Sequence, residues 1–369
     1  MALERFWNLE RIGIHAAEKD ETAIEYLQNY QDNFISFSDG KHCAKLPWKQ
    51  DHQSLPSSYG VTKRRTEANI KRLSEDPFIL QKYAQIIEEL ERRGFIEKVA
   101  KEFQPSQQVH YIPHHGAKKD SLTTPIRLVY DCSCRQARES PSLNDCLEST
   151  PTILNDLTAM LLRFRTHQYA VVTDIEKAFL NVSLHENDRD STRLFWLSNP
   201  NDPENPLITF RFKAVLFGAT CSPFILNAVL LKHLQMNSYV NAADTLKRDL
   251  YVDDVLSSFA HEMEALTYFR EARDLMTTAG FNLRSWMSNT PRLRELAEAE
   301  GCLDHDTITK VLGMRWQAVT YDLSYAPLDI PAIENATKRS ILQYSSRIYD
   351  PLGLLSPVTV RAKILMQEI

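Results

Sequence analysis

The segment Leu250-Tyr251-Val252-Asp253-Asp254-Val255-Leu256 places two adjacent aspartates between two short apolar runs. Runs of this kind are typical of β-strands, and a polar pair between them is typical of a hairpin turn. Aspartate is also a common turn former, so the pair alone is compatible with a purely structural turn. The apolar flanks favour a half-buried site, however, and buried acids need a charged partner or a metal ion.

A third aspartate ends another apolar run. Residues 169–175 read as a strand that delivers Asp174 at its end. If this strand lies beside the hairpin, Asp174 meets Asp253 and Asp254. Magnesium prefers oxygen ligands, and two such ions neutralise the charge that develops during nucleotidyl transfer. The sequence therefore predicts three aspartates that hold two Mg²⁺ ions, with Mn²⁺ as a substitute.

Strand-like and helix-like patterns alternate irregularly around these acids. A mixed order with a hairpin in the middle predicts an α+β fold and not a doubly wound α/β fold. One helix is well marked, because Asp76 can cap it, Pro77 suits its first position and Gly94 can end it. The expected strands are 95–99, 109–113, 126–132, 169–175, 194–197, 207–212, 281–286 and 309–316, and further helices are expected from Pro151 to 164 and over 222–236, 261–278, 332–348 and 359–369.

Composition limits the class of protein. With 43% apolar and 25% charged residues, the 369-residue chain reads as a globular protein of two or three packed units. No apolar run approaches the ~18 residues that span a bilayer, and the charged N-terminus does not resemble a signal peptide. Six cysteines without CxxC pairs favour reduced thiols. We expect an intracellular, cytoplasmic protein that is neither secreted nor bound to a membrane.

The net charge of −5 is unevenly distributed. Residues 62–75 carry five basic side chains against two acidic ones, and residues 334–369 carry five against three. Segregated charge of this kind can bind phosphates, but it also occurs on ordinary solvated helix faces. Both interpretations stay open. A zinc site is not predicted, because the spacing of His110, His114, His115, Cys132 and Cys134 matches no standard set of ligands.

The motifs, taken in order, resemble those of reverse transcriptases, and specifically those of the BEL/Pao class of retrotransposons. Tyr251-Val252-Asp253-Asp254 matches the YxDD box of reverse transcriptases. The segments 124–131, 171–180, 216–224, 279–286 and 312–316 resemble the fingers strand, the first, second and fourth palm motifs and the primer-grip turn. The segments 111–115, 142–145 and 349–357 favour the BEL/Pao class.

This resemblance implies a right-hand polymerase fold, with fingers, palm and partial thumb around an antiparallel palm sheet. It implies an RNA-directed DNA polymerase of a retroelement particle, which takes a primed RNA or DNA template and dNTPs. It also implies residue roles. The residues that would bind metal are Asp174, Asp253, Asp254 and, through its carbonyl, Ile175. Those that would bind the nucleotide are Arg127, Phe179, Phe217, Gly218 and Lys118. Those that would bind the primer or template are Tyr251, Val252, Ser222, Pro223, Leu312, Gly313 and Met314.

Under this resemblance, residues 1–74 form an N-terminal extension, 75–325 the fingers and palm, and 326–369 a partial thumb or connection. We expect no protease, RNase H or integrase in the chain. Two departures stand out: Phe217 replaces a common glutamine, and Ser285 follows Arg284 where a basic residue is usual. The alternative is a catalytically silent or co-opted retroelement fragment that binds nucleic acid or protein. Nothing in the sequence predicts the oligomeric state.

Overall fold

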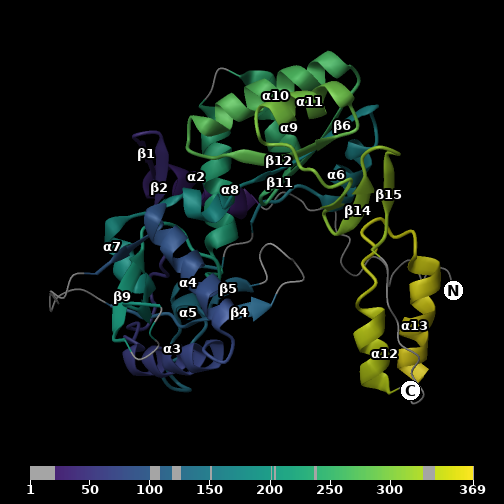
Figure 1. Cartoon of the computed structure of the whole chain (residues 1–369). Coiled ribbons are helices and arrows are strands. Elements are labelled where there is room, and N and C mark those ends of the chain that lie inside the picture. The colour runs from purple at the N-terminus through teal and green to yellow at the C-terminus, as the bar shows by residue number, and fades with distance from the viewer. Residues whose placement is uncertain are drawn as a thin grey trace. The chain divides into compact units, whose positions relative to one another are not determined.

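The computed structural model describes residues 21–99, 109–118, 126–149, 152–200, 202, 205–236, 239–326 and 337–368 (Figure 1). The chain is divided into two compact units. Unit 1 comprises Met1–Ile153 with Lys177–His233, and unit 2 comprises Leu154–Glu176 with Leu234–Ile369. Each unit contains both helices and largely antiparallel sheets, which confirms the α+β prediction.

A four-stranded sheet forms the centre of unit 2. Its strands are β10 (Leu250–Tyr251), β11 (Asp254–Phe259), β6 (Tyr169–Ile175) and β12 (Leu283–Ser288), in the order β10-β11-β6-β12. Every neighbouring pair in this sheet is antiparallel. The hairpin predicted around the two aspartates therefore exists, and its second strand lies beside the strand that carries Asp174. The antiparallel palm sheet is confirmed.

Helices cover both faces of this sheet. On one face, α9 (Val240–Asp249) and α10 (Glu262–Thr277) contact β11, and α10 also contacts β6. On the other face, α6 (Leu157–Phe164) packs against Ala170 and Val172 in one apolar cluster. Successive strand residues point to opposite faces, so β6 contributes to both layers. A further helix, α11 (Pro291–Ala299), contacts β12.

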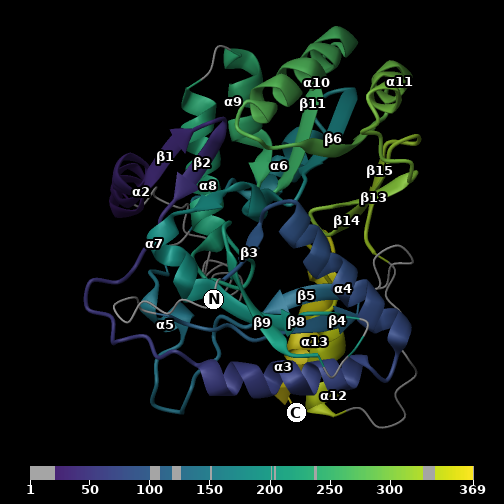
Figure 2. The same cartoon turned by 60° about the vertical axis from the view of Figure 1, so that its left-hand side comes forward.

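The C-terminal part of unit 2 adds a small sheet and two helices. Trp316 in this sheet is fully buried in the same apolar cluster as α6. The small sheet consists of β13 (Ile308–Val311), β14 (Met314–Gln317) and β15 (Asp322–Ser324), and α12 (Lys338–Ser345) and α13 (Ser356–Glu368) follow (Figure 2).

Unit 1 contains the predicted helix α4 (Pro77–Arg92), with Pro77 at its first position. The carboxylate of Asp76 accepts hydrogen bonds from the backbone amides of Phe78 and Ile79, which is the expected cap. Around it lie β3 (Ile96–Lys98), β9 (Leu207–Phe212) and β8 (Arg193–Leu197) in one sheet, the hairpin of β4 (His114–Lys118) and β5 (Ile126–Tyr130), and the helices α3 (Tyr59–Leu73), α5 (Leu143–Cys146) and α8 (Ser222–Gln235).

The segment before α3 also packs into unit 1. Its strand β2 (Lys41–Ala44) pairs in parallel with β7 (Ser183–Leu184), and the side-chain amide of Gln31 donates to the carbonyl of Ala228 at 2.8 Å. The carboxylate of Asp188 accepts from the backbone amide of Leu46. Residues 21–74 are thus held by long-range contacts; the division at residue 74 stays a prediction. The other elements here are α2 (Glu21–Phe34), β1 (Ile35–Ser38), η1 (Ala178–Asn181), α7 (Glu186–Arg189) and η2 (Asp190–Thr192).

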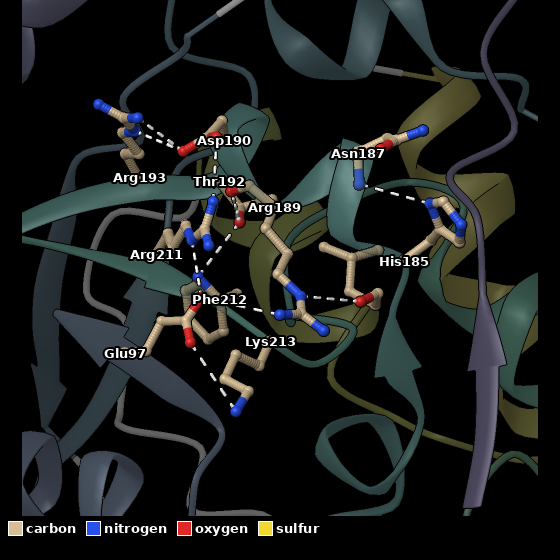
Figure 3. Close-up of polar contacts among 11 residues, drawn as sticks. Glu97, His185, Asn187, Arg189, Asp190, Thr192, Arg193, Arg211, Phe212 and Lys213 are labelled. Carbon is tan, nitrogen blue, oxygen red and sulfur yellow. Dashed lines mark hydrogen bonds and ion pairs between the residues drawn. The ribbon is translucent and has the colours of Figure 1, made fainter. Parts of the chain in front are cut away.

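A buried charge network ties the strands of unit 1 together (Figure 3). Asp190, 2% exposed, accepts hydrogen bonds from Arg193 at 2.7 Å and from Arg211 at 3.0 Å. Arg211 also donates to Glu97 at 2.7 Å, and Arg189 and Lys213 approach the same carboxylate. A buried carboxylate with charged donors on both oxygens satisfies its hydrogen bonds, so the network fixes β3, β8 and β9 relative to one another.

Three sequence expectations are wrong in detail. Residues 309–316, expected as one strand, form the antiparallel hairpin of β13 and β14, because the chain turns at 312–313. Residues 109–113 form no strand, because His110, Tyr111 and Ile112 donate to three separate partners and only an isolated bridge at Tyr111 remains. The helix expected from Pro151 begins at Leu157, where Asp156 caps it by accepting from the amide of Ala159. Pro151 itself, residues 124–125 and the expected helix start at 332–336 lie outside the described residues. Within the described part of the chain, no helix combines the length and apolar character that crossing a bilayer requires.

Candidate active site

The catalytic candidates lie at the hairpin turn of unit 2. Tyr251 pairs with Asp254, which leaves Val252 and Asp253 as a two-residue turn. Val252 has a φ of 58°, a left-handed conformation that is unfavourable for a β-branched residue. Strain of this size persists only where the surroundings hold it, and it is concentrated at functional turns.

The turn lies directly beside the end of β6. Asp254 and Asp174 are paired residues of neighbouring strands, and the amide of Ile175 donates to the carbonyl of Asp253 at 2.8 Å. The fold therefore brings together the three acids that the sequence singled out.

The carboxylates repel one another, and their environment shows it. Burial, together with the negative charges of Asp253 and Asp174, raises the pKa of Asp254 to about 6. One of the three carboxylates has a cationic neighbour that shares a hydrogen bond with it: Nε of Arg284 donates to Asp174 Oδ2 at 3.0 Å. In the described residues, no group of three or more His, Cys, Asp or Glu side chains is already assembled around a metal position.

The donor set nevertheless suits a hard divalent cation. Three carboxylates on two adjacent strands supply the oxygen ligands that Mg²⁺ prefers, and their surplus negative charge is relieved only partly by one arginine. Arg284 donates to Oδ2 of Asp174, so it competes with a metal ion for that oxygen. The residues fit the implied metal on these terms.

An irregularity in β12 places Arg284. The pairing of β12 with β6 shifts register between Arg284 and Met287, and Ser285 has a φ of 52°. Such a bulge redirects side chains at the edge of a sheet. Just before β12, the amide of Glu176 donates to the carbonyl of Asn282 at 2.9 Å, and Nδ2 of Asn282 donates to Oε2 of Glu176 at 3.0 Å. The arginine that the sequence marked as displaced is thereby directed onto Asp174.

The residues expected around the nucleotide gather in unit 1. The rings of Phe179 and Phe217 contact each other with centroids 4.7 Å apart, and the guanidinium of Arg127 lies 5.4 Å from the centroid of Phe217. Phe217, the departure from the usual glutamine, therefore bridges the other two. Arg127 is on an exposed position of β5, so its guanidinium can reach a phosphate. Lys118 pairs through its backbone with Ile126 in the same hairpin.

The turn that carries Phe217 is tightly built. Gly218 has a φ of 102°, and a methyl group on it would lie 2.3 Å from the backbone oxygen of Tyr130. Only glycine fits there. The hydroxyl of Ser222, to which the resemblance gives a role in primer or template binding, is buried and donates to the carbonyl of Leu216 at 2.7 Å. Pro223 follows it as the second residue of α8.

Asn144 is a residue whose role the sequence did not reveal. Its side-chain Nδ2 donates to the carbonyl of Gly218 at 3.1 Å, and its Oδ1 accepts from the amide of Thr220 at 2.9 Å. A third hydrogen bond joins Nδ2 to the hydroxyl of Ser133. Asn144 thus clamps the backbone on both sides of the Gly218 turn. It belongs to the segment 142–145, which the sequence marked only as typical of a class.

The expected primer-grip turn lies in unit 2. Val311 pairs with Met314, and Leu312 and Gly313 form the two-residue turn with φ values of 46° and 88°. Two positive φ values match a type I′ hairpin turn, which suits glycine better than leucine. Met314 and Leu312 belong to the buried cluster of unit 2, and Tyr251 packs against that cluster.

The basic segment of α3 is only partly neutralised. Arg65 pairs with Asp131 at 2.7 Å, whereas Lys63 and Lys71 line a groove of about 900 Å³ between α3 and β8 that also contains Glu67. The choice between phosphate binding and a solvated face stays open. The histidine and cysteine set shows no zinc geometry among the described residues: His114 is buried and bonds to the hydroxyl of Tyr83 and to the carbonyl of Phe195, and all six cysteines are free.

Comparisons with known proteins identify the family of the chain. A family model described as reverse transcriptase (RNA-dependent DNA polymerase) matches residues 98–285, just over half of the chain and the part that includes the acidic hairpin. The chain belongs to the reverse transcriptase family. A second family model, described as a Pao retrotransposon-like RNaseH-like domain, matches residues 337–369. Together the two matches make it a Pao-type retrotransposon reverse transcriptase.

A solved structure of a foamy viral protease–reverse transcriptase in complex with double-stranded DNA is also similar. The identity is 16% and the TM-score 0.37, and the match covers 55% of this chain and 29% of the foamy viral chain. This chain thus corresponds to less than a third of that protein. No curated protein matches the chain.

Proposed function

We propose that this chain is an RNA-directed DNA polymerase, which adds deoxynucleotides to the 3′-hydroxyl of a primer on an RNA or DNA template. The observation that carries the proposal is the pairing of Asp254 with Asp174 across two antiparallel strands, with Asp253 at the adjoining turn. This arrangement supplies three carboxylates at one edge of a rigid sheet, and phosphoryl transfer depends on such positioned anionic ligands.

Asp174, Asp253 and Asp254, with the carbonyl of Ile175, would hold two Mg²⁺ ions. When bound, these ions neutralise charge on the transferred phosphoryl group and activate the primer hydroxyl. The protein's own contribution is to fix the carboxylates: β11 and β6 are joined by their ladder and by the bond from Ile175 to Asp253. Two ligand groups on neighbouring strands of one sheet keep their separation, because that sheet is packed on both faces.

The incoming nucleotide would be held by the residues that unit 1 assembles. The guanidinium of Arg127 would bind the triphosphate, since its fork of N–H donors matches phosphate oxygens. Phe179 would lie under the sugar, and its contact with Phe217 supports the ring from the side. Because the Asn144 clamp fixes the backbone on both sides of the Gly218 turn, Phe217 is held in place.

Primer extension tests the proposal. The purified chain is given an RNA template with an annealed DNA primer, Mg²⁺ and labelled dTTP. Asp253→Asn should bind primer–template normally and lose extension by roughly a thousandfold, because a metal ligand that stabilises the transition state by several kcal/mol is gone. Asp244→Asn is the matched control, since Asp244 is exposed on α9 away from the hairpin, and it should extend normally.

The same assay separates the alternative of a silent, co-opted fragment. That fragment would bind primer–template but would not extend it with Mg²⁺ or Mn²⁺, and Asp253→Asn would change nothing. Extension by Asp253→Asn at the wild-type rate would show that this carboxylate is not a metal ligand.

A further inference from the structure

The loop Tyr349-Asp350-Pro351-Leu352-Gly353 lies beyond the residues matched to the polymerase family model, and yet it is attached to the core of unit 2. The carboxylate of Asp350 accepts hydrogen bonds from the hydroxyl of Tyr325 at 2.8 Å and from the amides of Leu354 and Leu355 at 3.0 and 2.6 Å. The loop is therefore closed on itself and tied to the strand segment that precedes it.

Two more contacts attach this loop to the core of unit 2. The carbonyl of Pro351 accepts from the hydroxyl of Thr158 in α6 at 3.0 Å. Leu352 packs against the apolar cluster that contains Leu312, Met314 and Trp316. With three separate attachments, the backbone on either side of Tyr349 has little freedom to move relative to the β13–β14 hairpin.

Tyr349 lies directly against the tip of that hairpin. A methyl group on Gly313 would be 2.5 Å from Cε1 of the Tyr349 ring and 2.9 Å from Cδ1, so the ring packs on the bare Cα of the glycine. The ring is still 47% exposed. Partial burial raises the pKa of the Tyr349 phenol, and the nearby phenol of Tyr251 in the YxDD box adds to this effect. Tyr349 is thus close to both the primer-grip turn and the catalytic hairpin.

Leu312 has a positive φ, which is unfavourable for a residue other than glycine, so this turn needs a restraint from its neighbours. Packing must supply that restraint. Leu312 anchors the inner side of the turn through its burial, and the ring of Tyr349 covers the outer side at Gly313. Removal of the ring would leave the outer side of the turn without a neighbour that fits the glycine.

We propose that Tyr349 is a positioning residue of the polymerase site, which holds the Leu312–Gly313 turn where it meets the primer terminus. The inference rests on the proposed function, because it assigns the turn to primer binding. It gives the loop at 349–353 a task in nucleotide addition, whereas the family match at 337–369 concerns an RNaseH-like domain. Because ring carbons of Tyr349 make the contact with Gly313, the aromatic ring should matter for this role and the hydroxyl should not.

The test compares Tyr349→Ala, Tyr349→Phe and the control Tyr344→Ala in the full 369-residue chain. Tyr344 is a partly buried tyrosine on α12 that contacts Arg347. We measure KM for primer–template, KM for dNTP, the melting temperature, and the fluorescence of a 2-aminopurine base at the primer 3′ end in the binary complex. Tyr349→Ala should raise KM for primer–template about tenfold, as expected for one lost aromatic contact, and should change the terminal fluorescence. KM for dNTP and the melting temperature should stay as in the wild type.

Tyr349→Phe keeps the ring and should restore wild-type values, and Tyr344→Ala should match the wild type. The inference is overturned if Tyr349→Ala leaves primer KM and fluorescence unchanged, if it lowers the melting temperature and raises both KM values together, or if Tyr344→Ala has the same effect. If the wild-type chain binds primer–template without extending it, only the proposed function is overturned. The fluorescence at the primer 3′ end can still be compared between the wild type and the Tyr349 variants. A chain that does not bind primer–template overturns both.

Discussion

Asn144 offers the sharpest test of how the nucleotide site is built. Its side chain makes three hydrogen bonds, to the carbonyl of Gly218, the amide of Thr220 and the hydroxyl of Ser133. Asn144→Ala removes all three. A hydrogen bond contributes about 0.5–1.5 kcal/mol net, so the upper limit is about 4 kcal/mol. Gly218 and Thr220 are exposed, however, so water replaces part of the loss and about 1–2 kcal/mol remains.

That loss falls on the turn that holds Phe217, and not on the core. Phe217 contacts both Phe179 and Arg127, so a looser turn weakens the binding of the incoming nucleotide. A cost of about 1–2 kcal/mol corresponds to a fall of roughly 5- to 30-fold in kcat/KM for dNTP. The affinity for primer–template should stay within about twofold, because the clamp touches none of the residues expected to bind the primer.

Asn144→Asp tests the donor and the acceptor of this side chain separately. The substitution keeps an acceptor for the Thr220 amide, but it replaces the donor that faces the Gly218 carbonyl at 3.1 Å with a carboxylate oxygen. Two acceptors at that distance repel, so the loss should equal or exceed that of Asn144→Ala. Asn33→Ala, on the exposed face of α2 with bonds only to Asn29, serves as control. The assay is single-nucleotide extension over a range of dNTP concentrations, with folding checked by thermal melting. If a folded Asn144→Ala keeps kcat/KM within twofold, the clamp does not position the site.

Three further predictions concern sugar selection, pH and hybrid cleavage. Phe179→Val should raise ribonucleotide incorporation relative to deoxynucleotide on the order of a hundredfold, because a 2′-hydroxyl over the ring would clash and lack a partner; an unchanged ratio of the two kcat/KM values would make Phe179 ordinary core packing. Burial lowers the pKa of His114 to about 4, so the unfolded chain takes up a proton at a higher pH than the folded chain does. The free energy of unfolding should therefore fall by about 3 kcal/mol as the pH drops from 6.5 toward 4. The urea midpoint of His114→Gln should vary less with pH than that of the wild type, and an equal pH dependence of the two midpoints would refute this. Finally, the 369-residue chain should not cleave the RNA of a labelled hybrid with Mg²⁺, because residues 337–369 contain only Asp350 and Glu368 as acids and Asp350 is engaged in closing its loop; Mg²⁺-dependent cleavage by pure protein would contradict it.

Local sequence pattern was sufficient for the parts of the fold that depend on neighbours in the chain. The acidic hairpin, the strand at 169–175 and the capped helix that begins at Pro77 all follow from residues within about ten positions, and the structure contains each of them. The start of α6 was misplaced because two residues, Pro151 and Asp156, are both suited to begin a helix. The carboxylate of Asp156 decides it by accepting from the Ala159 amide.

The features that sequence pattern did not reveal depend on contacts between distant segments. Asn144 meets the Gly218 turn across 74 positions, and Arg284 meets Asp174 across 110. The pairing of β2 with β7 joins residues 43 and 183 in parallel, which no hairpin pattern can indicate. A side chain's hydrogen-bonding capacity is visible in the sequence, but its partner is set by tertiary packing. The role of such a side chain can therefore be assigned only when the position of its distant partner in the fold is known.

The ion pair between Arg284 and Asp174 brings one positive charge to the three neighbouring acids. Burial and the charges of Asp253 and Asp174 raise the pKa of Asp254, and Arg284 of β12, which pairs with Asp174 at the end of β6, offsets part of the negative charge. Its side chain is 47% exposed, so it can turn away into water without burying its charge, and an exposed pair of this kind is weak. Arg284→Ala would remove the positive charge beside Asp174. The three carboxylates would then repel one another more strongly in the metal-free chain, but no arginine would compete with a metal ion for Asp174. Arg284 therefore connects the stability of the catalytic hairpin to the readiness of Asp174 to accept a cation, and the bulge between Arg284 and Met287 is the local structure that makes the connection possible.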